Sequence, residues 1–182
     1  AENIVLTYAL GVSEGLSCVM FYQLHDSVWH NKGGLNPRDR EYDFGIIYRD
    51  GAVKPSLLAY CASAEALDGA TFRQELTLPN PQIKGLTFDT PRGPMAILWS
   101  RADGYVLNGK DGNTYAALEP WVDPWQTKTR VSLAADGPVA LVDCIGRTTN
   151  TQPANGHVSV VLDGAPQIIY GLDLGALNSS GR

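Results

Sequence analysis

The chain has 182 residues, of which 44% are hydrophobic, and a net charge of −5, so it is long enough for one ordinary domain or two small ones and can bury a core. Its 14 Lys and Arg residues are scattered, which argues against nucleic acid or an anionic membrane surface as the main partner. No apolar run approaches the roughly 18 residues of a membrane span. The start lacks a signal-peptide pattern, and an extracellular or periplasmic location is favoured only if the chain is a mature product.

The chain begins with a predicted helix and strand. Apolar residues recur at helical spacing over residues 2–14, and Gly15 provides a stop. Residues 16–26 (LSCVMFYQLHD) form a nearly continuous apolar run, which is typical of a strand covered on both faces in a parallel sheet. Ligands collect at the carboxyl ends of such strands, so we expect a site there. The residues at that end that suit a site are Tyr22, Gln23, His25, Asp26 and Trp29.

A loop and a second helix follow. The polar stretch of residues 26–42 contains two glycines and a proline and is long enough for a functional loop. After a short apolar piece at residues 44–48, Pro55 stands at the first position of a helical pattern that runs to Gly69. Residues 1–70 are therefore predicted to form an α/β segment.

From residue 71 to residue 182 the pattern changes to short strands separated by Gly, Pro, Asn and Asp. Several such strands with frequent turns predict an antiparallel β-sandwich. The small polar tail over residues 175–182 is predicted to fray. The fold class is thus α+β, and the strands are predicted at residues 82–88, 94–100, 105–107, 129–133, 139–143, 157–162 and 167–171.

The three cysteines, Cys18, Cys61 and Cys144, are far apart in the sequence. They form neither a disulfide framework nor a metal-ligand pattern. Cys18 lies in the apolar run, Cys61 in a helical pattern and Cys144 in a strand-like run. We interpret them as buried thiols, and a single disulfide stays open as an alternative. His25 and His30 with Asp26 do not have the spacing of a standard metal site, so neither a metal nor another cofactor is predicted.

The order of these motifs resembles that of a glycoside hydrolase with an eight-stranded β/α barrel. "LSCVMFYQLHD", then "FGII", "DG" and "KP" before a helix with Tyr60, resemble the last helix-strand-helix part of such a barrel. "MAILWS", "VALVDCIGR" and "HVSVVLDGAPQIIYGL" are similar to strands of the sandwich that follows it. The resemblance implies a partial barrel segment over residues 1–70, a sandwich over residues 71–182 and a carbohydrate ligand.

The resemblance also implies what this chain lacks. Retaining glycosidases use two carboxyl groups about 5 Å apart. In the family these stand at the ends of the fourth and seventh barrel strands, whereas this chain begins at the helix after the seventh. The first hypothesis is therefore the C-terminal part of a glycosidase whose remainder was removed or lies on another polypeptide. A second polypeptide or a homo-oligomer would then complete the barrel. Tyr22, Gln23, His25, Asp26 and Trp29 would then line the substrate cleft.

Two other hypotheses start from the residues alone. The second is a non-catalytic carbohydrate-binding or structural β-sandwich, in which Trp121 and Trp125 of "EPWVDPWQ" offer aromatic faces to a glycan. The third is a small hydrolase in which Asp26 pairs with Glu41 or Asp43. If the chain catalyses a reaction, Asp26 is the first candidate, because it follows a rigid strand.

Overall fold

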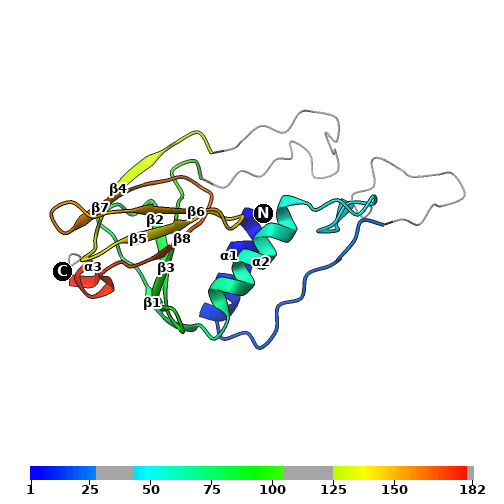
Figure 1. Ribbon diagram of the computed structural model, residues 1–182, viewed down its shortest axis with the longest axis horizontal. Coiled ribbons are helices and arrows are strands. Elements are labelled where there is room, and N and C mark those ends of the chain that lie inside the picture. The colour runs from blue at the N-terminus through cyan, green and yellow to red at the C-terminus, as the bar shows by residue number, and fades with distance from the viewer. Residues whose placement is uncertain (28–42, 105–124, 180–182) are drawn as a thin grey trace, which may run out of the picture.

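The computed structural model describes residues 1–27, 43–104 and 125–179 (Figure 1). Trp29, His30, Glu41 and Trp121, and the strand predicted at residues 105–107, lie outside the described residues. The helices are α1 (Glu2–Ser13), α2 (Pro55–Leu67) and α3 (Leu174–Ser179). The strands are β1 (Thr71–Glu75), β2 (Ile83–Thr90), β3 (Gly93–Ser100), β4 (Thr129–Ala134), β5 (Val139–Val142), β6 (Thr148–Thr151), β7 (His157–Leu162) and β8 (Gln167–Tyr170).

The first two helices begin and end close to where the sequence predicts. α1 ends before Gly15, whose φ of 69° is a left-handed conformation that suits glycine at a helix end. α2 starts with Pro55, whose missing N–H is no loss in the first turn, and it ends before Gly69, which has a φ of 64°. These two predictions are confirmed.

The strands form an antiparallel sandwich. Six strands pair in the order β1-β2-β3-β8-β5-β6, and β4 pairs with β7 in a second sheet. The core between the sheets includes Leu98 of β3, Leu133 of β4, Val160 of β7 and Ile169 of β8. The α+β class and the sandwich predicted from the sequence are confirmed.

The opposite face of the six-stranded sheet is covered by α1 and α2, which lie side by side in Figure 1. Met95 and Ile97 of β3 point to this side, where they pack with Val5 of α1 and Ala59 of α2. Neighbouring residues of β3 alternate between the two cores, which explains why Met95 to Leu98 are all fully buried. The division into residues 1–70 and 71–182 stays a prediction, and both parts contribute to this helix-side core.

The buried strand predicted at residues 16–26 is not formed. Residues 16–24, which we call the apolar segment, run as irregular chain after α1, and no neighbouring strand lies on either side of it in the described part of the structure. Met20 is 89% exposed and Tyr22 is 71% exposed. The prediction assumed neighbouring strands, and an apolar run gains the burial of a central strand only when such neighbours exist.

The sequence also missed elements at sheet edges and at the tail. β1 and β6 were not predicted, because both are short, polar edge strands. The described part of the tail predicted to fray lies in α3 instead, since Leu174 and Leu177 insert into the sandwich core. Cys18 and Cys61 are exposed rather than buried, Cys144 is half-buried, and all three thiols are free. The buried-thiol prediction was therefore wrong for two of the three.

Candidate functional site

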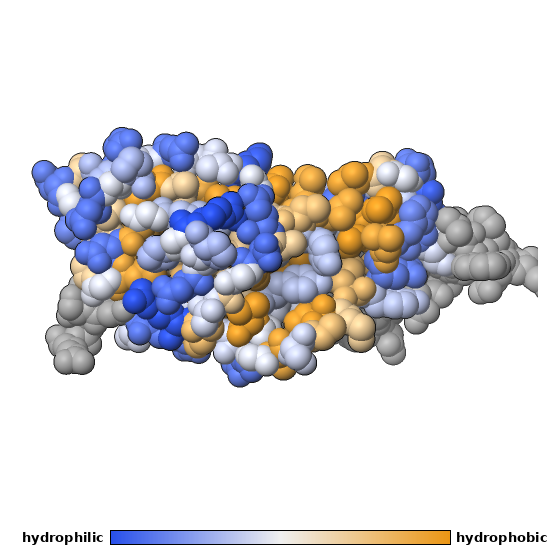
Figure 2. Space-filling model, turned by 60° about the horizontal axis from the view of Figure 1, so that its bottom comes forward, coloured by the Kyte–Doolittle hydropathy of each residue, from blue (hydrophilic) through white to orange (hydrophobic). Residues whose placement is uncertain are grey.

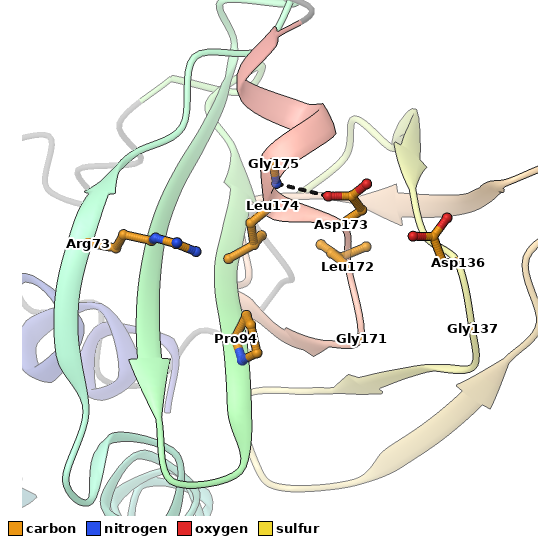
Figure 3. Close-up of a pocket in the computed structure, with 9 residues that line it drawn as sticks. All are labelled: Arg73, Pro94, Asp136, Gly137, Gly171, Leu172, Asp173, Leu174 and Gly175. Carbon is orange, nitrogen blue, oxygen red and sulfur yellow. Dashed lines mark hydrogen bonds between the residues drawn. The ribbon is translucent and has the colours of Figure 1, made fainter.

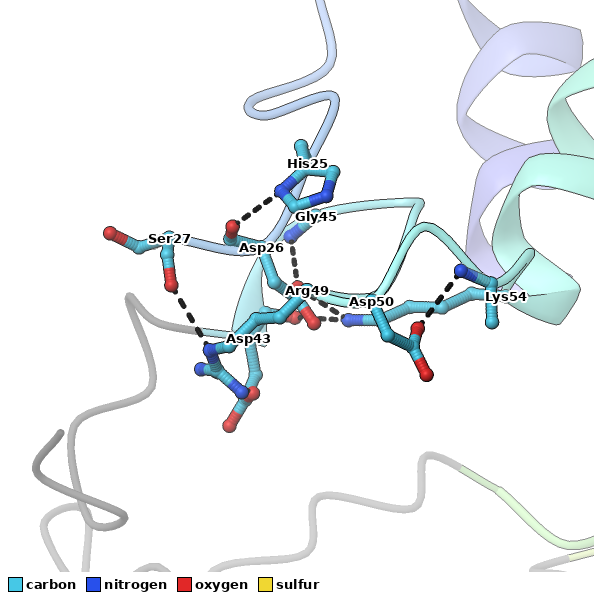
Figure 4. Close-up of polar contacts among 9 residues, drawn as sticks. His25, Asp26, Ser27, Asp43, Gly45, Arg49, Asp50 and Lys54 are labelled. Carbon is cyan, nitrogen blue, oxygen red and sulfur yellow. Dashed lines mark hydrogen bonds and ion pairs between the residues drawn. The ribbon is translucent and has the colours of Figure 1, made fainter. Parts of the chain in front are cut away.

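A cluster of polar residues lies where the apolar segment meets the chain before α2 (Figure 4). Its centre is the carboxylate of Asp26, which is only 2% exposed as a residue. Oδ1 of Asp26 accepts hydrogen bonds from Nζ of Lys54 at 2.6 Å and from the backbone N–H of Gly45 at 2.9 Å. We call Asp26, Asp43, Gly45 and Lys54 the Asp26 cluster.

A turn brings Lys54 to this carboxylate. The N–H of Tyr48 donates to the carbonyl of Ala52 at 2.8 Å, and Asp50 Oδ1 accepts from the N–H of Ala52 at 2.9 Å, so the chain reverses between them. The N–H of Lys54 then donates to the carbonyl of Ile46 at 3.3 Å. The ammonium of Lys54 also lies 4.9 Å from the centre of the Tyr48 ring, within cation–π range.

Position 45 has room only for glycine, because the backbone of the preceding segment lies against it. A Cβ added there would overlap the backbone of His25 and Asp26. This close approach allows the backbone N–H of Asp26 to donate to the carbonyl of Ile47 at 2.9 Å, beside a parallel bridge between His25 and Ile47. The cluster therefore fastens the end of the apolar segment to the start of the chain that leads into α2.

The structure does not pair the carboxylates of Asp26 and Asp43 with each other. The carboxylate of Asp43 forms an ion pair with Arg49 at 3.0 Å, and only its carbonyl oxygen reaches Lys54, also at 3.0 Å. Arg49 in turn donates to the carbonyl of Ser27. The carboxylates of Asp26 and Asp43, which the small-hydrolase hypothesis pairs with each other, are thus each paired with a cation instead. Glu41, the other acid of that hypothesis, lies outside the described residues.

One oxygen of the cluster lacks a partner within the described residues. Oδ2 of Asp26 is buried and has no hydrogen bond there. A buried carboxylate oxygen without a donor costs free energy, so the ion pair with Lys54 has to compensate for it.

The other residues predicted at this end are more exposed. The ring of Tyr22 packs edge-on against Phe44, with 6.5 Å between their centres. His25 Nδ1 lies 2.7 Å from the carbonyl of Asp26, and the carbonyl of Gln23 accepts from the N–H of Ile46. Tyr22, Gln23 and His25 therefore lie on the stretch of chain that leads to Asp26.

Trp125 lies elsewhere, between α1 and the loop that joins β7 to β8. Its indole N–H donates to Glu2 at 2.7 Å, and its ring lies directly against Gly164, where a Cβ would overlap it. The half-buried indole thus connects the first helix to the sandwich. Trp29 and Trp121 lie outside the described residues.

Within residues 1–27, 43–104 and 125–179, no group of three or more His, Cys, Asp or Glu side chains is arranged to hold a metal ion. Over the same ranges, no helix combines the length and the apolar character needed to cross a bilayer.

Comparisons with known proteins give a structural similarity. No protein-family model and no curated protein matches the sequence. Among solved structures, the chain is similar to a family 39 glycoside hydrolase from the gut symbiont Bacteroides cellulosilyticus WH2, with a TM-score of 0.63 and 22% identity. The similarity covers 91% of this chain and 29% of that one, so the chain spans less than a third of its neighbour's length. At this identity, the match concerns the fold.

Asp26 was predicted as a site residue from the sequence, whereas the roles of Gly45 and Lys54 were not. Both stand in the "FGII" and "KP" motifs that carry the resemblance to glycoside hydrolases. These motifs were recognised in the sequence. No sequence pattern, however, indicates that a glycine and a lysine nine residues apart donate hydrogen bonds to the same carboxylate oxygen.

Proposed function

We propose that this chain is a glycoside-hydrolase-related, carbohydrate-directed protein that has no catalytic carboxylate pair of its own. The observation that carries the proposal is the fold, which is similar over 91% of the chain to part of a family 39 glycoside hydrolase. Because one fold can host several functions, the role of this chain has to be argued from its side chains.

The contacts of Asp26 support a structural role for this residue. Acid catalysis or nucleophilic attack on a sugar requires a carboxyl group that the substrate can reach. The Asp26 side chain is 1% exposed and its Oδ1 is held by Lys54 and Gly45. These contacts favour Asp26 as the residue that fixes the end of the apolar segment over Asp26 as the catalytic acid.

The exposure of the apolar segment supports a partner that completes the fold. Figure 2 shows hydrophobic residues gathered on one face of the molecule. Leu16, Met20 and Leu24 are each at least 60% exposed, and an exposed apolar surface of this kind marks an interaction site. The first hypothesis predicts such a surface, because the missing barrel strands would cover it. We propose that these strands come from a second polypeptide or from another copy of this chain.

The mass of the native particle in solution, measured by light scattering, tests the completed-fold proposal. We expect an assembly, or a stable complex with a co-purifying polypeptide, that dissociates when Met20 and Leu24 are replaced by Ser. Val161→Ser on β7 is the matched control, since Val161 is also an exposed aliphatic residue, 42% exposed, but lies on the sandwich. A monomer that stays monomeric at high concentration, with the apolar segment protected from proteolysis, would contradict the proposal.

Activity is tested separately with a panel of nitrophenyl glycosides. We expect no turnover by the isolated chain and no change on Asp26→Asn. Turnover that disappears in Asp26→Asn, while the variant keeps its fold, would favour the small-hydrolase hypothesis instead.

The alternative is a non-catalytic carbohydrate-binding or structural β-sandwich module. The observation that favours it is the core between the two sheets, which this chain builds entirely from its own residues. Glycan affinity that is lost in Trp121→Ala or Trp125→Ala would support this alternative. Because the indole of Trp125 donates a hydrogen bond to Glu2, the stability of the Trp125→Ala variant has to be measured alongside its glycan affinity.

A further inference from the structure

A pocket lies on the sandwich, between the edge of the six-stranded sheet and α3 (Figure 3). Its volume is about 330 Å³, and it is formed by β1, the start of β3, the loop between β4 and β5, and the connection from β8 into α3. None of the residues proposed above for substrate binding lines it. It is a separate feature of the molecule.

The polar side chains of the pocket carry both signs of charge. The guanidinium of Arg73 extends from β1 over the sheet, and the carboxylates of Asp136 and Asp173 lie on the opposite side (Figure 3). Between them lies the exposed ring of Pro94, and the nearly buried Leu172 and Leu174 of the sandwich core form the floor. Because a guanidinium only donates hydrogen bonds and a carboxylate only accepts them, the pocket suits a ligand that offers both acceptors and donors.

These polar groups differ in how firmly they are held. Oδ1 of Asp173 accepts the N–H groups of Gly175 and Ala176, at 2.9 and 3.0 Å, which fixes its position at the start of α3. Arg73 is 47% exposed and its ion pair with Asp89 is long, at 3.7 Å. Such an exposed pair contributes little stability, so Arg73 can turn to a ligand at small cost.

Two glycines of the lining differ in the room around them. Gly171 has a φ of 88°, a conformation that side chains rarely adopt, and a Cβ there would overlap the carbonyl of Pro138. Gly137 has open space where a side chain would stand. A larger residue at Gly137 would therefore add bulk to the pocket lining without a clash at its Cβ.

We propose that this pocket binds one pyranose unit of a neutral glycan. Its hydroxyl groups would donate to Asp136 and Asp173, its oxygens would accept from Arg73, and its C–H face would contact Pro94. The mixed charge disfavours an anion or a cation, and the volume admits a single small ring. The inference deepens the proposed function, from which the sugar class is taken, by naming a sugar site outside the Asp26 region.

The test is a titration of the isotope-labelled full chain, followed by backbone amide NMR, with the methyl glycosides of glucose, galactose, mannose and xylose. Glycine is the control ligand, because a zwitterion would also satisfy both charges. We expect at least one glycoside to shift the amides of Gly137, Gly171 and Gly175. Shifts of these amides by glycine alone, or by no sugar, would overturn the inference.

Variants then assign the contacts. Arg73→Ala and Asp136→Asn should each weaken binding by about tenfold or more, the loss of one hydrogen bond to a charged group. Arg130→Ala is the matched control, because Arg130 is an arginine on β4 that does not line the pocket. Gly137→Leu should abolish binding while the amide spectrum elsewhere is retained. Undiminished affinity in Gly137→Leu would overturn the inference.

The two proposals fail in different ways. If sugars shift the amides of residues 22–27 but not those of the pocket, the pocket inference is wrong and the proposed function is supported. If the pocket binds a glycoside and the particle is a monomer with a protected apolar segment, the pocket inference stands and the completed-fold part of the proposed function is wrong.

Discussion

Lys54 Nζ lies 2.6 Å from Oδ1 of Asp26, and the two side chains are 12% and 1% exposed. Removing one partner of a buried ion pair leaves an uncompensated charge and costs roughly 3–5 kcal/mol. We expect Lys54→Met to lower the free energy of unfolding by this amount in urea denaturation. The double variant Asp26→Leu with Lys54→Met should be less destabilised than Lys54→Met alone.

The exposed pair between Arg92 and Glu65 is the control for this prediction. Its side chains are 48% and 73% exposed, so Glu65→Gln should change stability by no more than about 1 kcal/mol. Equal losses in Lys54→Met and Glu65→Gln would mean that the Asp26 cluster does not hold the chain together.

Gly45→Ala tests the close approach at the same cluster. The added Cβ would overlap the backbone of His25 and Asp26, so the two chain segments have to separate. We expect a loss of about 3 kcal/mol, the upper part of the usual range for overpacking, together with faster amide exchange at Asp26. Gly137→Ala, which meets open space, should stay within about 0.5 kcal/mol of the parent chain.

Asp143 should give the protein a pH dependence in the acid range. Burial raises the pKa of this carboxyl, but hydrogen bonds from the N–H and side chain of Arg147 and from the N–H of Ile145 outweigh it, and the net shift is downward from 3.8. A lowered pKa in the folded state means that the stabilisation is present above the unfolded pKa and is lost as the pH falls through the folded pKa. Thermal unfolding at a series of acid pH values should show this decline, and it should be shallower in Asp143→Asn.

The three thiols should react at different rates with iodoacetamide. Cys18 and Cys61 are exposed, whereas Cys144 is half-buried and burial raises its pKa, which lowers its thiolate fraction. We expect mass spectrometry at neutral pH to show two fast alkylations and one slow one. Fast labelling of Cys144 in the folded chain would contradict its position between the helices and the sheet.

Prediction from sequence succeeded where the signal is local. Pro55 stands at the start of α2, and Gly69 follows its end. It failed for the apolar segment, because the same run of residues is a strand or an exposed segment according to what lies beside it. Cys18 was misplaced for the same reason.

The first two helices, most of the strands and the α+β class follow from local patterns, since helix ends, turns and apolar periodicity depend on neighbours along the chain. The contacts of Gly45 and Lys54 with Asp26, and the hydrogen bond from the indole of Trp125 to Glu2, arise from tertiary packing. Those contacts join residues 19, 28 and 123 positions apart, respectively. Which distant groups meet depends on how the sheets and helices pack, and no local pattern encodes it.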